Sequence, residues 1–321
     1  MNDCVLFSIL IPAYKSQFFS AAIESILMQT YKDWELVIVD DHSPEDLKNI
    51  VDSFADNRIR YYRNEKNYGA IDVVDNWNKC LSYAKGDYVI CMGDDDILTE
   101  YALEEYVNLI KRYPDKKIYH GRTEIIDENN CGIEILEPRG EVESPLEFIY
   151  YRWQGRKQYI GDFCYEKTTL ISLGGYYKLP MAWASDDISA VRQAKEGEGI
   201  VNSNRILFKY RINTLSITGS GNSGIKMSAL TLEQRWYEEF LKDYNRDLCT
   251  SEVPFYNYIA GLFEKFYIKK RIALISSDIC ANMWSIFVWL RKSHMYGISI
   301  THVAYAFVIG VIDRIKKHHH K

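Results

Sequence analysis

The chain has 321 residues, of which 47% are hydrophobic and 26% are charged, and its formal net charge is −5. A chain of this length can bury a large core, and the composition is that of an ordinary globular protein. The mildly negative charge excludes the basic surface typical of proteins that bind nucleic acid, so we expect no nucleic-acid partner.

The N-terminus is polar and acidic around Asn2 and Asp3, where a secretory signal would carry basic residues and a long apolar run. We therefore expect a cytoplasmic protein. The seven cysteines are scattered, and none forms a Cys-x-x-Cys pair. Cys80 and Cys91 fall within apolar patterns, which predicts buried thiols rather than metal ligands or disulfides.

Strand and helix patterns alternate through the first half of the chain. Apolar residues at helical spacing predict helices around residues 22–27 and 73–84. Repeated alternation of this kind predicts an α/β fold with a mainly parallel sheet flanked by helices. The short apolar runs that predict its strands are residues 7–11, 34–39, 58–62 and 88–92.

A second helix is expected to begin with Ser43 as its cap and Pro44 in its first position. Asp40 and Asp41 would then lie at the carboxyl end of the preceding strand. In open α/β sheets, ligands bind at that edge.

The pattern loosens after about residue 115. Strands are expected at residues 118–126 and 200–212, and a helix is expected from near Asp186 to a stop at Gly197. After about residue 225 the chain has a wholly helical pattern.

Two apolar runs near the C-terminus, residues 284–290 and 303–312, are shorter than the roughly 18–20 residues that span a bilayer. They could form helices lying on an anionic membrane surface, or a helical cap packed on the rest of the protein. The basic residues that accompany them are Arg291, Lys292, Arg314, Lys316 and Lys317.

Three adjacent carboxylates, Asp94, Asp95 and Asp96, directly follow the apolar run that ends at Met92. Adjacent carboxylates repel one another unless they are solvated or bridged by a cation. Oxygen ligands suit Mg²⁺ or Mn²⁺, and such an ion would let an acidic site accept a nucleotide diphosphate. The alternative is a solvated turn that caps the next helix.

A further acidic pair, Asp186 and Asp187, follows Trp183 and opens a predicted helix. Either carboxylate could act as a general base that takes a proton from an attacking hydroxyl. The alternative is ordinary capping of the helix start.

In their order along the chain, these residues resemble the inverting family 2 glycosyltransferases, which have a GT-A fold. The resemblance is dense over the first hundred residues, looser to about residue 215 and absent beyond. The motifs that carry it are Ile9–Tyr14, Ser25–Tyr31, Val37–Ser43, Asn64–Gly69, Asn76–Asn78, Gly86–Tyr88, Asp94–Asp95, Gly174–Tyr176 and Trp183–Asp187.

The resemblance implies a role for each motif. Asp41 would read a uracil base, and the paired acids beginning at Asp94 would hold the metal and the donor ribose or diphosphate. Asp186 or Asp187 would be the catalytic base, with Asp186 favoured because it stands six residues before Arg192. Arg211 could reach the diphosphate. The remaining residues expected to bind the nucleotide sugar are Pro12, Ala13, Tyr14, Asn67, Gly69 and Asn76.

The chain departs from the family pattern at several positions. Met92 stands where an acid is often found two residues before the pair, and Asn213 stands where a His is often found. Asp96 extends the acidic run, so which two carboxylates bind the metal stays open. Residues 219–224 match a G-x-G-x-x-G pattern, but no apolar strand precedes them, which disfavours a dinucleotide site.

The expected organisation is a GT-A-like catalytic domain over residues 1–222 and a helical region over residues 223–321. The nucleotide-binding half would cover about residues 1–115, and the acceptor half about 116–222. The expected function is transfer of a single sugar, from a UDP-sugar in preference, to a glycan or lipid-linked oligosaccharide in bacterial O-antigen or capsule assembly. The alternatives are a sugar-nucleotide nucleotidyltransferase and an inactive homologue that binds membrane.

Overall fold

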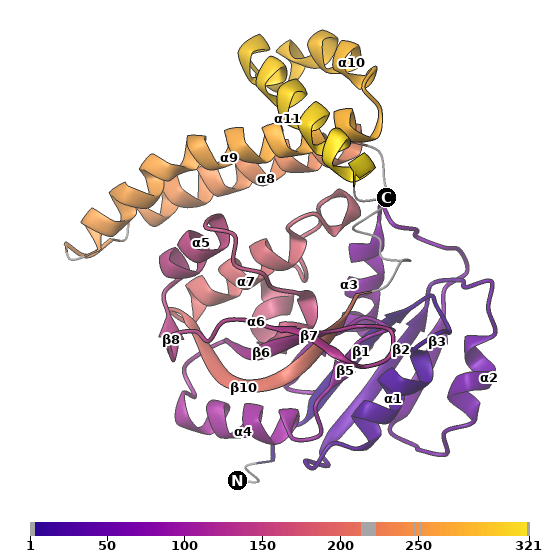
Figure 1. Ribbon diagram of the computed structural model, residues 1–321. Helices are drawn as coiled ribbons and strands as arrows, with labels where there is room; N and C mark the ends of the chain where they lie inside the picture. The colour runs from indigo at the N-terminus through magenta and orange to yellow at the C-terminus, as the bar shows by residue number, and fades with distance from the viewer. Residues whose placement is uncertain (1–3, 213–222, 247, 251, 320–321) are drawn as a thin grey trace. The chain divides into compact units, whose positions relative to one another are not determined.

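The computed structural model describes residues 4–212, 223–246, 248–250 and 252–319. Strands and helices alternate through the first 112 residues, as the sequence predicts (Figure 1). The elements are β1 (Phe7–Ala13), α1 (Phe19–Leu27), β2 (Trp34–Asp40), α2 (Leu47–Asp52), β3 (Ile59–Arg63), α3 (Val73–Tyr83), β4 (Tyr88–Cys91), β5 (Ile97–Leu98) and α4 (Ala102–Arg112).

The following segment returns to the same sheet. The strand predicted at residues 118–126 is β6, and the helix predicted from near Asp186 is α7, which ends before Gly197. The elements are β6 (Ile118–Ile126), β7 (Gly132–Ile135), β8 (Val142–Glu143), α5 (Pro145–Trp153), η1 (Ile160–Asp162), β9 (Phe163–Glu166), α6 (Lys167–Ser172), η2 (Pro180–Ala182), α7 (Ser185–Glu196) and β10 (Ile200–Arg211).

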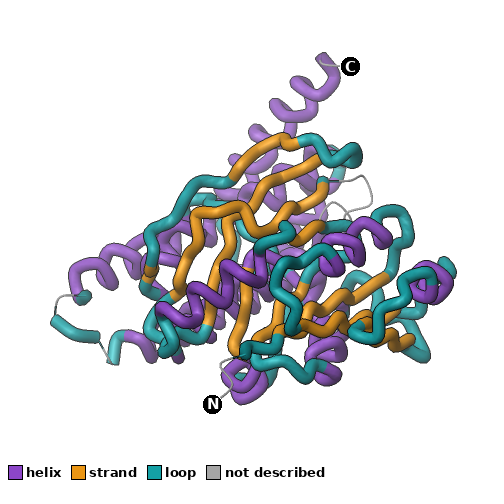
Figure 2. Tube along the Cα trace, turned by 90° about the horizontal axis from the view of Figure 1, so that it is seen from below, coloured by secondary structure: helices purple, strands orange, loops and turns teal. Residues whose placement is uncertain are grey.

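Within the described residues the strands form one ten-stranded sheet in the order β3-β2-β1-β4-β9-β6-β10-β5, with β7 on β6 and β8 on β10. The first four strands are mutually parallel. β9 runs antiparallel to both β4 and β6, so the second half of the sheet is mixed. Figure 2 shows these strands running side by side with helices around them.

The central parallel strands β1 and β2 are buried on both faces, whereas the edge strand β3 is partly exposed. Every residue of β2 is buried, and so is nearly all of β1. Parallel strands of this kind need helices on both faces, which explains their near-continuous apolar sequence. β10 is strongly bent (Figure 1), and its pairing with β6 shifts register between Ser203 and Ile206. The cysteines predicted to be buried thiols, Cys80 and Cys91, are buried and free.

The predicted start of the second helix is wrong. α2 begins at Leu47, and its cap is Asp46, whose Oδ1 accepts a hydrogen bond from the Asn49 N–H. Ser43 lies in the preceding turn, where its Oγ donates to the Tyr14 carbonyl. The same Oγ accepts a hydrogen bond from the Glu45 N–H within this turn, whereas Asp46 accepts from the first turn of the helix.

The C-terminal region is helical, as predicted, and its helices pack on one another. Glu233 of α8 is buried, and it accepts hydrogen bonds from Lys270 of α9 and from the Trp183 indole. Gly310 lets α11 approach α9, because a Cβ there would lie 2.6 Å from the Ser276 carbonyl oxygen. The elements are α8 (Ser223–Tyr244), α9 (Val253–Ala281), α10 (Ser285–Lys292), η4 (His294–Tyr296) and α11 (Ile300–His319).

The chain divides into two compact units, residues 1–178 with 184–219, and residues 179–183 with 220–321. The sheet runs unbroken through both halves of the first unit. The short segment 179–183 groups with the helices, which the sequence did not predict. In the part of the chain that the structure describes, no helix combines the length and apolarity needed to cross a membrane.

Candidate functional site

Polar segments follow β1, β2 and β4 where these parallel strands end. Ala13 pairs with Asp40 at the end of β1 and β2, and β4 runs alongside β1 in the same direction. The Asp41 N–H donates to the Ala13 carbonyl, which ties the first two segments together. The parallel register therefore brings Tyr14, Asp41 and the acids after β4 to one edge of the sheet, as predicted from the strand pattern.

Asp41 organises the loop that follows β3. Its carboxylate accepts hydrogen bonds from Asn64 Nδ2 at 2.9 Å and from the Tyr68 and Gly69 N–H groups at 3.0 and 3.3 Å. Gly69 has a φ of +69°, a conformation that favours glycine. Asn76 accepts from the same Asn64 side chain and donates to the Val39 carbonyl. These residues form one connected polar network.

Asp94 joins the loop after β4 to the loop after β1. Its Oδ2 accepts hydrogen bonds from the Tyr14 and Lys15 N–H groups at 2.6 and 2.7 Å. Burial, together with the neighbouring charge of Asp95, raises the pKa of Asp94 to about 6. Asp94 therefore shapes the backbone around Tyr14, whose side chain is 43% exposed.

The carboxylates of Asp95 and Asp96 both lie close to Gly93. A Cβ at Gly93 would lie 2.8 Å from an oxygen of each carboxylate, so a larger residue there would displace the two acids. Asp95 forms an ion pair with Lys15 Nζ at 3.0 Å. Asp96 accepts from the Gly93 and Arg211 N–H groups, and burial with the charge of Asp95 raises its pKa well above the usual value.

The three acids do not form a three-ligand metal site. Among the described residues, no group of three His, Cys, Asp or Glu side chains is arranged to hold an ion. Backbone N–H groups engage the carboxylates of Asp94 and Asp96, and which two of the three acids would bind a metal stays a prediction. The set still fits Mg²⁺ or Mn²⁺, since such ions are commonly held by one or two carboxylates plus substrate phosphates.

Arg211 lies at the end of β10 beside this edge and is buried. Its Nε donates to the Asp95 carbonyl, and its two terminal nitrogens donate to the Asp127 carbonyl and to Asn130 Oδ1. Each guanidinium nitrogen thus has an acceptor within the protein, and a diphosphate would compete with these acceptors for the hydrogen bonds of Arg211. Contact between Arg211 and a donor stays a prediction.

The other residues predicted to contact a donor lie in or beside the same loops. Ala13 is buried, Pro12 is partly buried, and Asn67 is exposed. Asn213 and residues 219–222 lie outside the described residues, so the predictions made for them have no structural counterpart here.

Asp186 and Asp187 open α7 in different environments. Asp187 is buried, and it receives a two-point ion pair from Arg152, with bonds of 2.9 and 2.8 Å. Gln158 Nε2 donates to the same carboxylate. Asp186 has no comparable pairing among the described residues, and burial together with the charge of Asp187 raises its pKa to about 7.

The sequence did not predict the partners of Asp187. Arg152 ends α5 and Gln158 lies in the following loop, and neither belongs to a motif of the resemblance. The ion pair between Lys15 and Asp95 was also missed. The turn before α7 is strained, since Met181, Ala182 and Ala184 all have positive φ. Such strain is common beside functional residues.

Residues 8–165 match the family model described as Glycosyl transferase family 2. This stretch, about half of the chain, therefore belongs to glycosyltransferase family 2. The match contains the whole acidic edge and ends before α7.

Curated relatives agree with this assignment. The Escherichia coli protein UDP-Glc:alpha-D-GlcNAc-diphosphoundecaprenol beta-1,3-glucosyltransferase WfgD is 33% identical over 138 residues, which cover 43% of this chain and 53% of that protein. The putative colanic acid biosynthesis glycosyl transferase WcaA of Escherichia coli K12 is 36% identical over 110 residues, or 33% of this chain and 38% of that protein. The chain thus matches only about half or less of the length of these relatives.

Solved structures resemble a larger part of the chain. S. aureus TarS 1-349 in complex with UDP-GlcNAc has a TM-score of 0.60 at 15% identity, covering 92% of this chain and 93% of that chain. The mannosyltransferase PcManGT from Pyrobaculum calidifontis in complex with GDP-Man and Mn²⁺ has a TM-score of 0.54 at 13% identity, covering 97% and 87%. At these identities the likeness shows the fold, which is GT-A-like.

Proposed function

We propose that this chain is a metal-dependent, inverting glycosyltransferase that moves one sugar from a nucleotide diphosphate donor to an acceptor hydroxyl. The observation that carries the proposal is the contrast within the acidic pair of α7. Asp187 is held by Arg152, whereas the pKa of Asp186 is raised to about 7. A carboxylate with such a pKa is suited to general-base catalysis near neutral pH.

The donor would bind at the carboxyl edge of β1, β2 and β4. Asp41 would read the base, and Pro12, Ala13, Tyr14, Asn67, Gly69 and Asn76 would line the nucleotide site. A UDP-sugar is favoured because the name of WfgD includes UDP-Glc and TarS was solved with UDP-GlcNAc. Because the mannosyltransferase was solved with GDP-Man, GDP is the alternative nucleotide to compare with UDP in a binding test.

The metal would be Mn²⁺ or Mg²⁺, with Asp95 as its main protein ligand and Asp94 or Asp96 beside it. Asp95 is favoured because backbone N–H groups engage the carboxylates of both neighbours. When bound, the ion would supply positive charge that stabilises the departing diphosphate. Lys15, which pairs with Asp95, would add a second positive charge at the same edge.

Asp186 would take the proton of the acceptor hydroxyl as its oxygen attacks the anomeric carbon. Attack from the face opposite the diphosphate breaks the bond to the leaving group in one displacement and inverts the configuration. Arg152 and Gln158 would hold Asp187 and thereby the first turn of α7. Burial, together with the negative charge of Asp187, raises the pKa of Asp186 and makes it basic enough to accept the proton.

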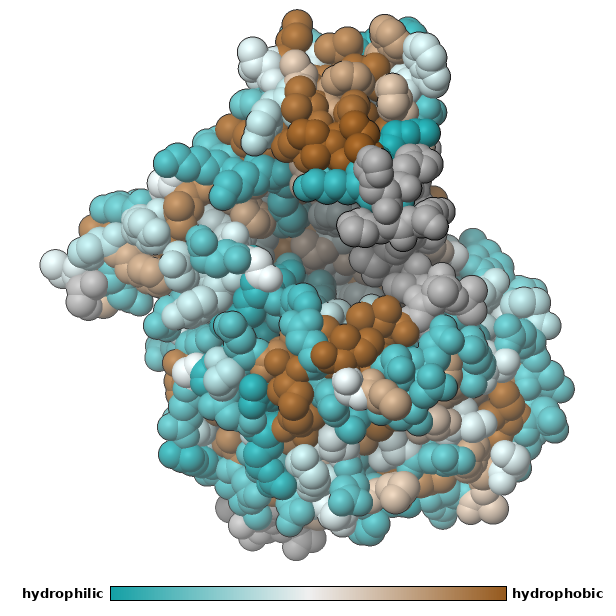
Figure 3. Space-filling model, in the orientation of Figure 1, coloured by the Kyte–Doolittle hydropathy of each residue, from teal (hydrophilic) through white to brown (hydrophobic). Residues whose placement is uncertain are grey.

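The acceptor would be a glycan or lipid-linked oligosaccharide of a bacterial surface polysaccharide, assembled at the cytoplasmic face of the membrane. The names of WfgD and WcaA, which include diphosphoundecaprenol and colanic acid biosynthesis, support this choice. The surface of α10 and α11 supports contact with lipid. Figure 3 shows hydrophobic side chains gathered over these helices, where Trp284 and Phe287 are 75% and 62% exposed.

Calorimetric titration of UDP and GDP, with Mn²⁺ and with EDTA, tests the donor site. The wild-type chain should bind UDP only with the metal, and Asp95→Asn should weaken binding by roughly tenfold or more, because a charge-assisted contact is lost. Asp115→Asn, which removes an exposed carboxylate elsewhere in the same unit, should bind as the wild type does. If neither nucleotide binds under any metal condition, the transferase proposal fails and the inactive, membrane-binding homologue replaces it.

A further inference from the structure

A cavity of about 300 Å³ lies in the acceptor half of the first unit, away from the residues predicted to bind the donor. Its lining comes from β6, from the β7 segment and from residues 151–157 at and after the end of α5. His120, Thr123, Leu136 and Arg139 are buried at its base, whereas Tyr151 and Lys157 are exposed at its mouth. The volume is at the low end for small-molecule sites and suits one charged group or one sugar.

Two buried basic side chains at this cavity have nitrogen atoms without a hydrogen-bond partner among the described residues. Arg139 is 7% exposed, and its Nη1 has no partner among the described residues. Neither ring nitrogen of His120 has a hydrogen-bond partner, and its Nε2 lies 3.9 Å from Asp162 Oδ2. Buried donors are nearly always paired, so unpaired donors facing a cavity indicate a ligand that accepts hydrogen bonds.

The charges around the cavity favour an anion. Arg156 is paired with Glu143, and Lys157 is paired with Glu134 at the rim. Within the described part of the chain, neither Arg139 nor Arg122 has a carboxylate at ion-pair distance, and the remaining acid of the lining is the exposed Glu137. Burial lowers the pKa of Arg139 to about 9, and the charges of Asp162 and Glu143 offset this only in part. Because burying a guanidinium without a direct ion pair is costly, an anionic partner would stabilise Arg139.

The wall of the cavity is connected to Asp187, which directly follows the proposed catalytic base Asp186 in the chain. Arg152 donates to the Arg156 carbonyl on one side and to the Asp187 carboxylate on the other. Gln158, which directly follows the lining segment, also donates to Asp187. No residue of the loops after β1, β2 or β4 lines the cavity.

We propose that this cavity binds an oxyanion, a phosphate or a carboxylate, carried by the acceptor, with Arg139 and Arg122 as its cationic partners and His120 as a neutral donor. The proposal rests on the proposed function, because it assigns the anion to the molecule that meets Asp186. The oxyanion could belong to the diphosphate of a lipid-linked acceptor or to an acidic sugar.

The test titrates inorganic phosphate, pyrophosphate and glucuronate into the full chain by calorimetry, with and without UDP and Mn²⁺. We expect at least one of these anions to bind whether or not the nucleotide site is filled. Arg139→Gln should weaken that binding by roughly tenfold to a hundredfold, because a hydrogen-bonded ionic contact is lost. Binding of phosphate or pyrophosphate assigns the anion to a lipid diphosphate, and binding of glucuronate alone assigns it to an acidic sugar.

Two further variants keep the test decisive. Arg122→Gln removes a positive charge from the cavity and leaves the buried Arg139 unchanged. This variant replaces Arg139→Gln in the test if Arg139→Gln fails to fold. Arg112→Gln removes an exposed charge on α4, and it should bind the anion as the wild type does. Absence of binding for every anion, displacement of the anion by UDP, or equal binding by all variants overturns the proposal. UDP binding measured on the same samples tests the donor site separately, so the two failures are distinguishable.

Discussion

At the scale of single residues, the two acids that open α7 differ in what surrounds them. Asp187 faces the guanidinium of Arg152, and Asp186 faces the charge of Asp187. Pairs of carboxyl groups whose environments separate their pKa values are typical of acid–base sites. The different surroundings lead to three predictions.

Replacement of Asp186 by Asn should remove the proton acceptor while keeping the shape of the side chain. We expect kcat to fall by about 10²- to 10⁴-fold, the usual contribution of a general base, with UDP affinity unchanged. Single-turnover sugar transfer and nucleotide titration on the same sample measure the two quantities. Loss of nucleotide affinity with unchanged transfer at saturation would assign Asp186 to donor binding instead.

The raised pKa of Asp186 also predicts a pH dependence. Below a pKa of about 7 the carboxyl group is protonated and cannot accept the proton of the acceptor, so kcat/KM should fall roughly tenfold per pH unit. Above that pH the rate should level off. A pH–rate profile of the wild type checks this, and a flat profile between pH 5 and pH 8 would contradict the assignment.

Replacement of Asp187 by Asn should act on stability as well as on rate. It leaves the Arg152 guanidinium without its carboxylate, and removing one partner of a largely buried pair costs about 3 kcal/mol. Urea denaturation of Asp187→Asn beside Asp186→Asn measures the difference. Equal unfolding free energies for the two variants would mean that the ion pair does not stabilise the fold.

At the scale of elements, α5 carries Arg152 and leads into the segment that lines the anion cavity. Its start has a complete capping box, in which Ser144 and Glu147 each accept a hydrogen bond from the other's backbone N–H, and Pro145 occupies the first turn. Such caps fix where a helix begins.

Loss of this cap should destabilise the first unit. Ser144→Ala should lower the free energy of unfolding by about 1 kcal/mol, because an N–H of the first turn loses its acceptor. Ser82→Ala within α3 provides the control, since its exposed hydroxyl bonds only the Lys79 carbonyl of the same helix. If both variants unfold at the same urea concentration, the capping box does not contribute.

Helices and strands were predictable where the sequence pattern that indicates them lies within the element itself. The strand at 118–126 and the helix from Ser185 to Glu196 follow from apolar runs, spacing and a glycine stop within the element itself. The start of α2 was wrong because Ser43 caps only the turn through Glu45, and the helix itself begins after Asp46, which accepts from its first turn. The antiparallel strand β9 was also not predicted, and it takes its place in the sheet by pairing with β4 and β6, which are distant in the sequence.

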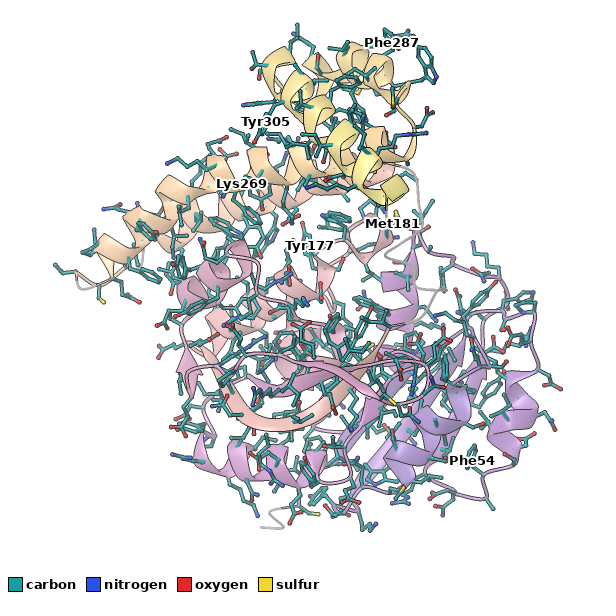
Figure 4. The ribbon with its side chains drawn as sticks, viewed as in Figure 1. Phe54, Tyr177, Met181, Lys269, Phe287 and Tyr305 are labelled. Atoms are coloured by element: carbon teal, nitrogen blue, oxygen red, sulfur yellow. The ribbon has the colours of Figure 1, made fainter. Side chains whose placement is uncertain are left out.

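At the scale of the whole molecule, the helical unit presents apolar and basic side chains together. Phe287 of α10 and Tyr305 of α11, both labelled in Figure 4, are exposed, and so is Trp284, whose ring stacks on Phe287. Exposed apolar clusters of this kind often mark surfaces that bind membranes or proteins. Arg291 and Lys292 in the last turn of α10 favour an anionic lipid surface.

This surface predicts binding to anionic vesicles that weakens with salt. Replacing both Trp284 and Phe287 by Ser should lower vesicle partitioning by roughly tenfold or more, because burial of each large apolar side chain contributes about 1.5–3 kcal/mol. Ile171→Ser, an exposed apolar residue of α6, is the matched control. Equal sedimentation of the variants with the vesicles would argue against lipid contact through α10.

By itself, the sequence determined the alternation of strands and helices over the first 112 residues, the family of residues 8–165 and the acids that meet at the sheet edge. These features depend on spacing along the chain and on the rule that parallel strands end together. Only the tertiary structure decided what each acid contacts. Asp94 bonds the backbone of a loop 80 residues away, and Asp187 pairs with Arg152, 35 residues earlier and outside every motif. Hydrogen bonds and ion pairs depend on distance in space, which local sequence patterns do not record.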